Sequence, residues 1–250
     1  MNRVFSALFW IYLGLTCVLL WPIAALIWLV CLPFDPRRVV LHRFSCWWGF
    51  HYVQLCPVWQ VQFEGLENIP TDRPAMLVAN HQSLGDIPVL YGLKRHFKWV
   101  SKAAIFKLPI IGWNMRMNRY VRLVRGNRRS VAQMLDDCKA HLLQGSSILM
   151  FPEGTRSKDG QLRPFKPGSF LLARKLGVPV VPIVLDGTVN ALPKDGWVMK
   201  MNQRRPIRIS VLPPVEPAAF GEDAGELAEQ IRTQMARRLS EMRTGEAESV

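Results

Sequence analysis

The stretch "VANHQSLGD" places a histidine and an aspartate at a spacing that requires a bend in the chain. His81 and Asp86 are five residues apart, and in a continuous helix such positions point about 140° away from one another. Gly85, directly before the aspartate, permits a bend. One interpretation is a strand-to-helix turn in which Asp86 only complements the helix dipole. The other is a pair in which the carboxylate orients the imidazole, so that His81 acts as a general base on a substrate hydroxyl.

A second polar block follows an apolar run that ends at Phe151: "FPEGTRSKDGQLRPFKPGSF". A segment this rich in Pro, Gly and Lys/Arg is typical of a loop, and α/β domains build their sites on loops at the carboxyl ends of strands. Glu153 and Arg156 form either a local ion pair or a site for a phosphorylated substrate. In a phosphate site, Arg156 binds anionic oxygens, while Glu153 holds Arg156 or accepts from a hydroxyl.

Several other kinds of catalyst lack their motifs in this chain. There is no GxSxG elbow, no HExxH, no Walker loop with GK[ST] and no GxGxxG after a strand, which argues against a hydrolase of the α/β type, a zinc protease, a P-loop NTPase and a dinucleotide enzyme. No His or Cys pair has the spacing of a metal site, so we expect no metal.

The elements that must position these residues alternate between short β-branched runs and helical patterns, which is typical of an α/β domain. We expect helices over 128–144, with Asn127 as N-cap and Gly145 as its end, over 168–176, and from about 223 to 242. One face of the first helix would carry Val131, Leu135, Cys138, Leu142 and Leu143. The expected strands are 58–63, 75–79, 98–101, 120–124, 148–151, 178–184 and 207–212.

The front of the chain is apolar. Val4–Pro33 has no charged residue over thirty positions, more than the roughly 20 needed to cross a bilayer core. Pro22 could kink this run, so two geometries remain open: a tilted span, or a helix that enters one leaflet and turns back. The next segment, Arg37–Phe50, mixes arginines with Trp47 and Trp48, as expected of a helix at the headgroup level. We therefore expect membrane-attached helices over 1–57 and an α/β domain over 58–250, on the cytoplasmic side by the positive-inside rule.

The charge of the chain favours anionic partners. Lys and Arg number 32 against 19 Asp and Glu, a formal net charge of +13, which suits phosphates, acidic lipids, acidic proteins or nucleic acid. Lys94–Arg129 alone holds eleven basic residues and no acidic one. The five cysteines are scattered without a CxxC pair, and we interpret them as reduced packing residues of a protein that faces the cytosol.

Four blocks of the sequence resemble a known family. "NHQSLGD" fits the NHx4D motif and "FPEGTRS" the second hallmark block of the glycerolipid acyltransferases, in particular the bacterial 1-acylglycerol-3-phosphate acyltransferases. "VRLVRGNR" lies where that family has a block ending in an arginine, and "VPVVPIVLDG" resembles its fourth, Val-Pro-rich block. The likeness covers roughly residues 58–215. It implies a mixed, mostly parallel sheet flanked by helices and preceded by a membrane-associated segment, in a bacterial inner membrane.

The resemblance also implies a reaction that needs no cofactor. His81, supported by Asp86, would take the proton from the sn-2 hydroxyl of lysophosphatidate. The hydroxyl would then attack an acyl thioester directly, without an acyl-enzyme, to give phosphatidic acid. The donor would be acyl-coenzyme A or acyl carrier protein, and either would be drawn to the basic field.

By the same similarity, Glu153, Arg156 and Lys102 would hold the glycerol-phosphate head, and backbone N–H groups near Gly154 would face the oxyanion. Arg125 would be a further phosphate contact. Family members often have an acidic residue before that arginine, and here Val124 takes its place. The alternatives to Arg125 are therefore Arg122 and Arg128.

Two other functions remain compatible with the sequence. The first is the same acyl transfer to another acceptor: glycerol 3-phosphate, a lysophospholipid or a lyso-aminolipid. The acceptor is selected by the shape of a pocket rather than by these motifs. The second is a non-catalytic, basic, membrane-bound protein that recruits acidic lipids or nucleic acid, since aromatic and basic residues interleave at 96–99 and 113–120. That second function leaves the His-Asp and Glu-Arg blocks without a purpose, and we expect no nucleic-acid partner.

Overall fold

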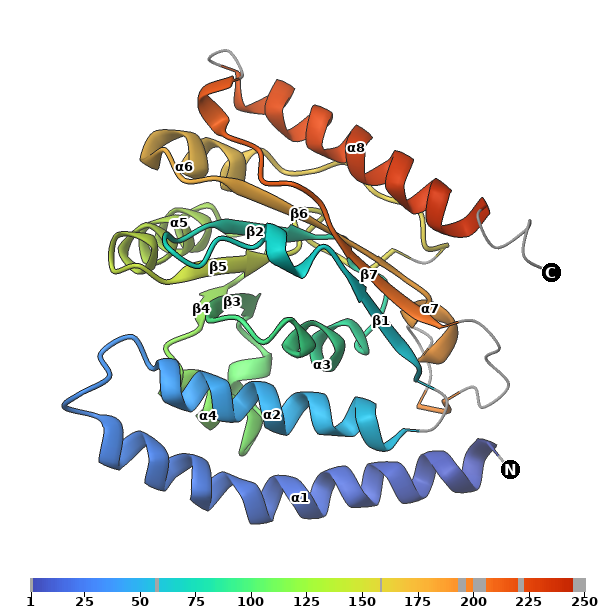
Figure 1. Ribbon diagram of the computed structural model, residues 1–250. Helices are drawn as coiled ribbons and strands as arrows, with labels where there is room; N and C mark the ends of the chain where they lie inside the picture. Colours follow the sequence, from blue (N-terminus) through green and yellow to red (C-terminus); the bar gives the residue numbers. More distant parts are fainter. Residues whose placement is uncertain are drawn as a thin grey trace.

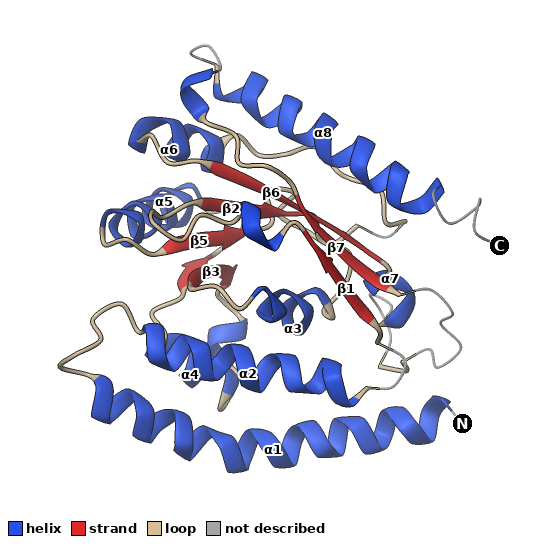
Figure 2. Cartoon of the chain, viewed as in Figure 1, coloured by secondary structure: helices blue, strands red, loops and turns tan. Residues whose placement is uncertain are grey.

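A computed structural model describes residues 2–56, 59–157, 159–192, 197–199, 206–219 and 223–244. The chain forms layers around one sheet: helices α5, α6 and α8 cover one face, α2, α3 and α4 cover the other, and α1 lies outermost beyond α2 (Figure 1). Figure 2 shows the strands running through the middle of this stack. The predicted α/β class is confirmed, with an apolar helix at the front of the chain.

The sheet is mixed and mostly parallel, as expected. Over the described residues its seven strands lie in the order β1-β7-β6-β2-β5-β3-β4, and among these pairs only β6-β7 is antiparallel. Strands β2 to β6 therefore all end at one edge, which we call the carboxyl edge. Each predicted strand is present within three residues of its expected ends; residue 58, the expected start of the first, lies outside the described residues. The strands are β1 (Val61–Glu64), β2 (Met76–Ala79), β3 (Phe97–Lys102), β4 (Val121–Leu123), β5 (Ser147–Met150), β6 (Val180–Asp186) and β7 (Ile207–Val211).

Alternate residues of the central strands face two different cores. Met76 and Val78 of β2 pack with α5, α6 and α8, whereas Leu77 and Ala79 pack on the side of α2, α3 and α4. All four are fully buried. A parallel strand covered on both faces reads as a continuous apolar run, which explains why these strands were recognisable in the sequence.

The first face is covered by α5 (Arg128–Leu143), α6 (Gly168–Leu176) and α8 (Ala224–Thr244). As predicted, Asn127 caps α5, and its side chain accepts from the Ser130 N–H. The predicted apolar face of α5 is partly wrong, because Leu143 is 69% exposed while Leu142 is buried. Adjacent helical residues point about 100° apart, so both leucines cannot face the sheet. The Val131 side chain, in the first turn, is exposed as well.

The second face is covered by α2 (Val39–Leu55), α3 (Asp86–Leu90) and α4 (Ile111–Met117). Helix α2 buries Leu41, Trp48 and Val53 between the domain and α1, and leaves Trp47 exposed. In the part of the chain that the structure describes, the other short helices are α7 (Thr188–Ala191) and the 3-10 turns η1 (Leu66–Asn68), η2 (Tyr91–Leu93), η3 (Ile105–Lys107) and η4 (Pro217–Ala219).

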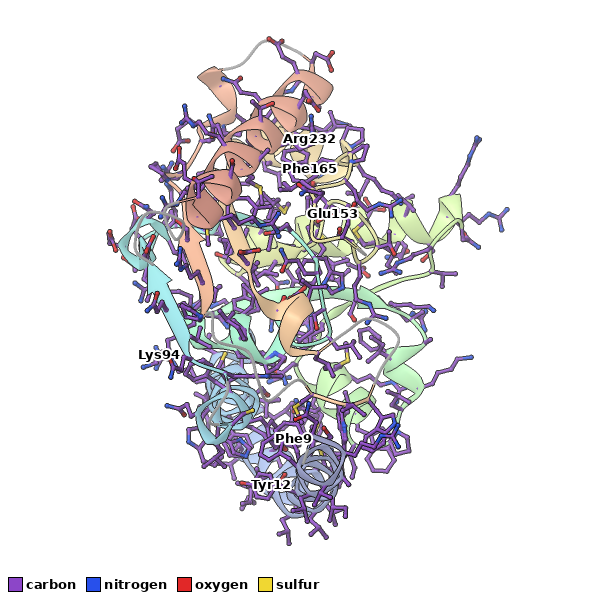
Figure 3. The ribbon with its side chains drawn as sticks, turned by 90° about the vertical axis from the view of Figure 1, so that its right-hand side faces the viewer. Phe9, Tyr12, Lys94, Glu153, Phe165 and Arg232 are labelled. Atoms are coloured by element: carbon purple, nitrogen blue, oxygen red, sulfur yellow. The ribbon has the colours of Figure 1, made fainter. Side chains whose placement is uncertain are left out.

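Helix α1 (Asn2–Cys31) runs unbroken through Pro22 and lies along α2 (Figure 1). It is long and apolar enough to cross a membrane, and large apolar side chains along its length, such as Leu8, Leu19 and Leu29, are exposed. Its amino-terminal half contacts a distant segment, because Trp10 donates to the Trp197 carbonyl at 2.7 Å. Phe9 and Tyr12 lie on α1 at the bottom of Figure 3. The boundary predicted between residues 57 and 58 lies outside the described residues.

Candidate active site

The polar turn after β2 is tied to the end of β6. The Asn80 side chain pairs with both backbone groups of Leu185: its Nδ2 donates to the carbonyl at 2.9 Å, and its Oδ1 accepts from the N–H at 2.7 Å. The Gln82 Nε2 donates to the same carbonyl at 3.0 Å. Both side chains are buried. Together they extend the β2-β6 pairing by side-chain hydrogen bonds and fix the backbone on both sides of His81.

His81 and Asp86 meet, as the second interpretation of their spacing requires. The imidazole Nδ1 lies 2.7 Å from the Asp86 Oδ2, and the chain bends in a turn in which the Asp86 N–H donates to the Ser83 carbonyl. Gly85 keeps an ordinary right-handed conformation in this turn. Asp86 is fully buried, whereas the His81 side chain retains 11% exposure. Because Nδ1 faces the carboxylate, Nε2 is the nitrogen that can meet a substrate.

The Asp86 carboxylate is held by further donors. Its Oδ2 also accepts from the backbone N–H groups of Gln82 at 2.7 Å and Ser83 at 2.9 Å. Its Oδ1 accepts from the hydroxyl of Thr188, which is fully buried at the start of α7. Four donors thus compensate the charge of this buried carboxylate and fix its plane. Sequence reasoning missed Thr188; its only signal was a position directly after the "VLDG" of the fourth block.

Phe151 sets the plane of the imidazole. Its ring stacks on that of His81 with centroids 3.9 Å apart and planes inclined by 12°. This residue opens the second block, at the end of β5, next to β2 in the sheet. From the sequence, Phe151 was predicted only as the last residue of a strand. The contact joins the two blocks directly.

Glu153, labelled in Figure 3, is buried and binds backbone donors of two different segments. Its Oε1 accepts from the His81 N–H at 2.8 Å, and its Oε2 accepts from the Arg163 N–H at 3.2 Å. Burial raises the pKa of this carboxyl to about 7, against the opposing effect of these two donors. In this arrangement Glu153 holds the backbone of the His81 turn to the loop of the second block.

Gly154 makes the turn at which this loop leaves β5. It has a φ of +70°, which is strained for any residue with a side chain. Its N–H donates to the Phe151 carbonyl at 3.1 Å, so that amide is engaged within the turn. Further along, the Ser157 N–H donates to the His81 carbonyl at 2.8 Å. The loop therefore returns to the turn after β2 that carries His81.

The three predicted phosphate contacts lie along the carboxyl edge in the order of the strands. Arg156 follows β5 and is half-buried, Lys102 ends β3 and is exposed, and Arg125 follows β4 and is exposed. Neighbouring strands are about 4.8 Å apart, so β4 lies roughly 14 Å from β2, the strand that carries His81. The structure thus places Arg156 on the strand next to His81, and Arg125 farthest along the edge. Among the residues that the structure describes, no three His, Cys, Asp or Glu side chains gather in a way that could hold a metal ion.

Comparisons with known proteins give one consistent result. The family model described as acyltransferase matches residues 60–186. A chloroplastic 1-acyl-sn-glycerol-3-phosphate acyltransferase of Arabidopsis thaliana is 41% identical over 209 residues, which are 82% of this chain and 56% of that protein. A protein of the same name from Escherichia coli is 28% identical over 84% of this chain and 83% of its own length.

The crystal structure of the 1-acyl-sn-glycerophosphate acyltransferase PlsC from Thermotoga maritima superposes with a TM-score of 0.78, at 28% identity, over 97% of this chain and 98% of that one. The chain spans less than two thirds of the length of three of these relatives, 56% to 64% of the proteins of Arabidopsis thaliana, Brassica napus and Chlamydomonas reinhardtii.

Proposed function

This chain belongs to the acyltransferase family, and we propose that it transfers an acyl group from a thioester to the free sn-2 hydroxyl of 1-acylglycerol 3-phosphate, giving phosphatidic acid. The relatives named for this reaction come from plants, yeast and bacteria. The observation that carries the proposal is the His81-Asp86 pair, in which the carboxylate holds Nδ1 and leaves Nε2 for the acceptor.

The chemistry needs one base and a good leaving group. Nε2 of His81 removes the proton from the acceptor hydroxyl as its oxygen bonds to the thioester carbonyl carbon, and Asp86 stabilises the imidazolium that forms. The tetrahedral oxyanion then collapses, the carbon–sulfur bond breaks, and the imidazolium returns the proton to the thiolate. The products are the ester and a free thiol. No covalent acyl-enzyme is required.

The phosphate of the acceptor is the feature that the basic residues at this edge would recognise. Arg156 is the first candidate, because it follows the strand beside His81 and its guanidinium can bind two phosphate oxygens at once. Lys102, one strand farther, can reach the same group with its long side chain. Arg125, with Arg122 or Arg128 as alternatives, is better placed for phosphates of an acyl-coenzyme A or for an acidic acyl carrier protein.

The acceptor and product are lipids, so the enzyme must work at a membrane. Helix α1 would attach it, with the arginine-rich flank, Arg37, Arg38 and Arg43, on the same side as the catalytic domain. Relatives are named from chloroplasts and from bacteria. For this chain the sequence predicts the cytoplasmic side of a bacterial inner membrane.

The test follows thiol release from acyl-coenzyme A and from acyl carrier protein by membranes that contain the full chain, with and without lysophosphatidate. Release that requires the acceptor and disappears in His81→Ala supports the proposal and identifies the donor. The matched control is His141→Gln, a buried histidine on α5 outside this site, which should retain release.

A panel of acceptors separates the remaining possibilities. Release with glycerol 3-phosphate or a lysophosphatidylcholine, but not with lysophosphatidate, would keep the acyl transfer and overturn the acceptor. Arg156→Glu should impair phosphorylated acceptors more than an acceptor without phosphate. Equal losses on both would contradict the phosphate role of Arg156.

A further inference from the structure

The turn between η3 and α4 exposes apolar side chains that the proposed reaction does not use. Leu108 is 48% exposed, Ile111 42% and Trp113 43%. They come from one short stretch, "KLPIIGW", rather than from scattered surface positions. A cluster of large apolar groups on a surface marks a contact with another apolar phase or molecule.

The backbone of this turn is strained. Ile110 has a φ of +62° and a ψ of −64°, and the Ile111 N–H donates across it to the Pro109 carbonyl at 2.6 Å. This is the rare form of γ-turn, and a β-branched residue adopts it at a cost. The sharp reversal leaves Leu108 and Ile111, on either side of it, both exposed.

The cluster continues the outward face of α1. The ring of Trp113 meets that of Trp21 on α1 edge-on, with centroids 5.1 Å apart, and Ile110 packs on the core between α1 and α2. On α1 itself Leu15, Val18 and Leu19 are exposed. Figure 1 shows the chain near α4 descending behind α2 toward α1. The two apolar surfaces are therefore contiguous.

Along the sequence, the segment that carries the cluster has only one sign of charge. Lys107 and Arg116 flank it and are exposed, and the whole of 94–129 holds no acidic residue. A tryptophan beside lysine and arginine at the rim of an apolar surface is the composition of a membrane interface with anionic headgroups. A second protein copy would have to present the acidic complement.

We propose that the turn 107–116 is a membrane contact in its own right, in which Leu108, Ile111 and Trp113 insert into an anionic leaflet beside α1. The contact lies on the side of the domain that carries β3 and α4, so together with α1 it fixes the tilt of the domain on the membrane. A contact away from the α1 axis limits rotation of the domain about that helix, in addition to the exposed Trp47 of α2. This inference goes beyond the proposed reaction and does not depend on it.

The test measures how deeply single labelled positions enter the bilayer, with the full chain reconstituted in lipid vesicles. Cys31 is half-buried and the other four cysteines are buried, so a Cys31→Ser background allows labelling with an environment-sensitive fluorophore at Leu108→Cys. Leu15→Cys on α1 is the reference for insertion. Leu143→Cys on α5, the most exposed leucine of that helix, is the reference for water.

We expect the probe at position 108 to shift to the blue and to be quenched by lipids with brominated acyl chains, as the probe at 15 is. Quenching should be stronger in vesicles of phosphatidylcholine with phosphatidylglycerol than in phosphatidylcholine alone. Lys107→Gln with Arg116→Gln should remove that difference. A probe at 108 that behaves like the one at 143 overturns the proposal, and so does a blue shift without quenching, which would indicate a protein partner. Thiol release measured on the same samples reports separately on the reaction.

Discussion

The molecule buries two polar clusters built around a histidine, at opposite edges of one sheet. At the carboxyl edge His81 binds a carboxylate through Nδ1 and keeps part of its ring exposed. At the other edge His42 is fully buried, with Nδ1 at 2.8 Å from the Tyr120 hydroxyl and Nε2 at 3.2 Å from the Arg95 carbonyl. Burial holds the pKa of His42 well below its usual value.

The difference shows what a histidine needs in order to act as the proposed base and what a structural histidine lacks. Both are held by hydrogen bonds, so order alone does not distinguish them. His42 has no carboxylate among its hydrogen-bond partners and uses both nitrogens inside the protein, and hence it can neither stabilise an imidazolium nor reach a substrate. His81 has a carboxylate on one side and an accessible nitrogen on the other. Each prediction below changes one cluster and is read against the other.

Loss of the base should have the largest effect. Removing a general base costs about 10² to 10⁴ in rate, and we expect His81→Ala to lower kcat by that order. The free energy of unfolding should fall by about 1.5–3 kcal/mol, because the buried Asp86 carboxylate loses one of its donors, so kcat is measured on the folded protein. Single-turnover kinetics and urea unfolding on the same preparation check both statements. Turnover near that of the wild type would remove His81 from the mechanism.

Lys98 is the corresponding target in the other cluster, and its loss should affect stability rather than rate. This buried lysine donates from Nζ to the carbonyls of Arg37 and Asn118, both at 2.7 Å. It thereby ties the start of α2 and the end of α4 to β3. Lys98→Met leaves the buried Asn118 carbonyl and the partly buried Arg37 carbonyl without this donor, and an unpaired buried group costs about 1–3 kcal/mol.

Urea unfolding should therefore show a loss of a few kcal/mol for Lys98→Met, while the kcat of the folded fraction stays within about twofold of wild type, since nothing at the carboxyl edge changes. A large loss of kcat in folded protein would show that the two edges are coupled.

Thr188 tests whether the carboxylate needs all of its donors. Thr188→Val keeps the shape of the side chain and removes the hydroxyl that donates to Asp86. A hydrogen bond to a charged group contributes about 1.5–3 kcal/mol, so we expect kcat to fall at least about tenfold with KM unchanged. Thr188→Ser should recover most of the rate. A serine variant as slow as the valine variant would point to packing instead of the hydroxyl.

The two clusters also differ in how far the sequence revealed them. His81 and Asp86 were found because their spacing is local and the intervening turn is short, and the buried strands were found from their continuous apolar runs. Thr188 was missed because its partner is 102 residues away in the chain, and only the β2-β6 pairing brings them together. The burial of Lys98 was not predicted either, because a lysine beside aromatic residues in a strand is expected to be exposed. Helices α3 and α4 are too short to show a period.

Each edge of the sheet buries a group whose pKa lies near 7: Glu153 at the carboxyl edge, where the pKa is raised, and Lys98 at the other edge, where it is lowered. Burial raises the pKa of Glu153 from 4.5 to about 7. Between these two pH values the folded state therefore holds a proton that the unfolded state has lost. Its contribution to the free energy of unfolding is present below about pH 4.5 and is lost as the pH rises to 7.

The pKa of Lys98 is lowered from 10.5 to about 7, mainly by burial and further by the nearby charge of Arg119. Here the unfolded state holds the extra proton, so stability rises from pH 7 toward 10.5. Burial also lowers the pKa values of His42, His96 and His141, so their contribution to stability rises with pH up to about 6.5. The contributions of Glu153 and Lys98 are therefore measured as differences between wild type and variant. Urea unfolding should show that the difference in the free energy of unfolding changes between pH 4.5 and 7 for Glu153→Gln, and between pH 7 and 10.5 for Lys98→Met. If either variant kept the slope of the wild type in its own pH range, the group responsible would have to be another one, and burial at that edge would not be the cause.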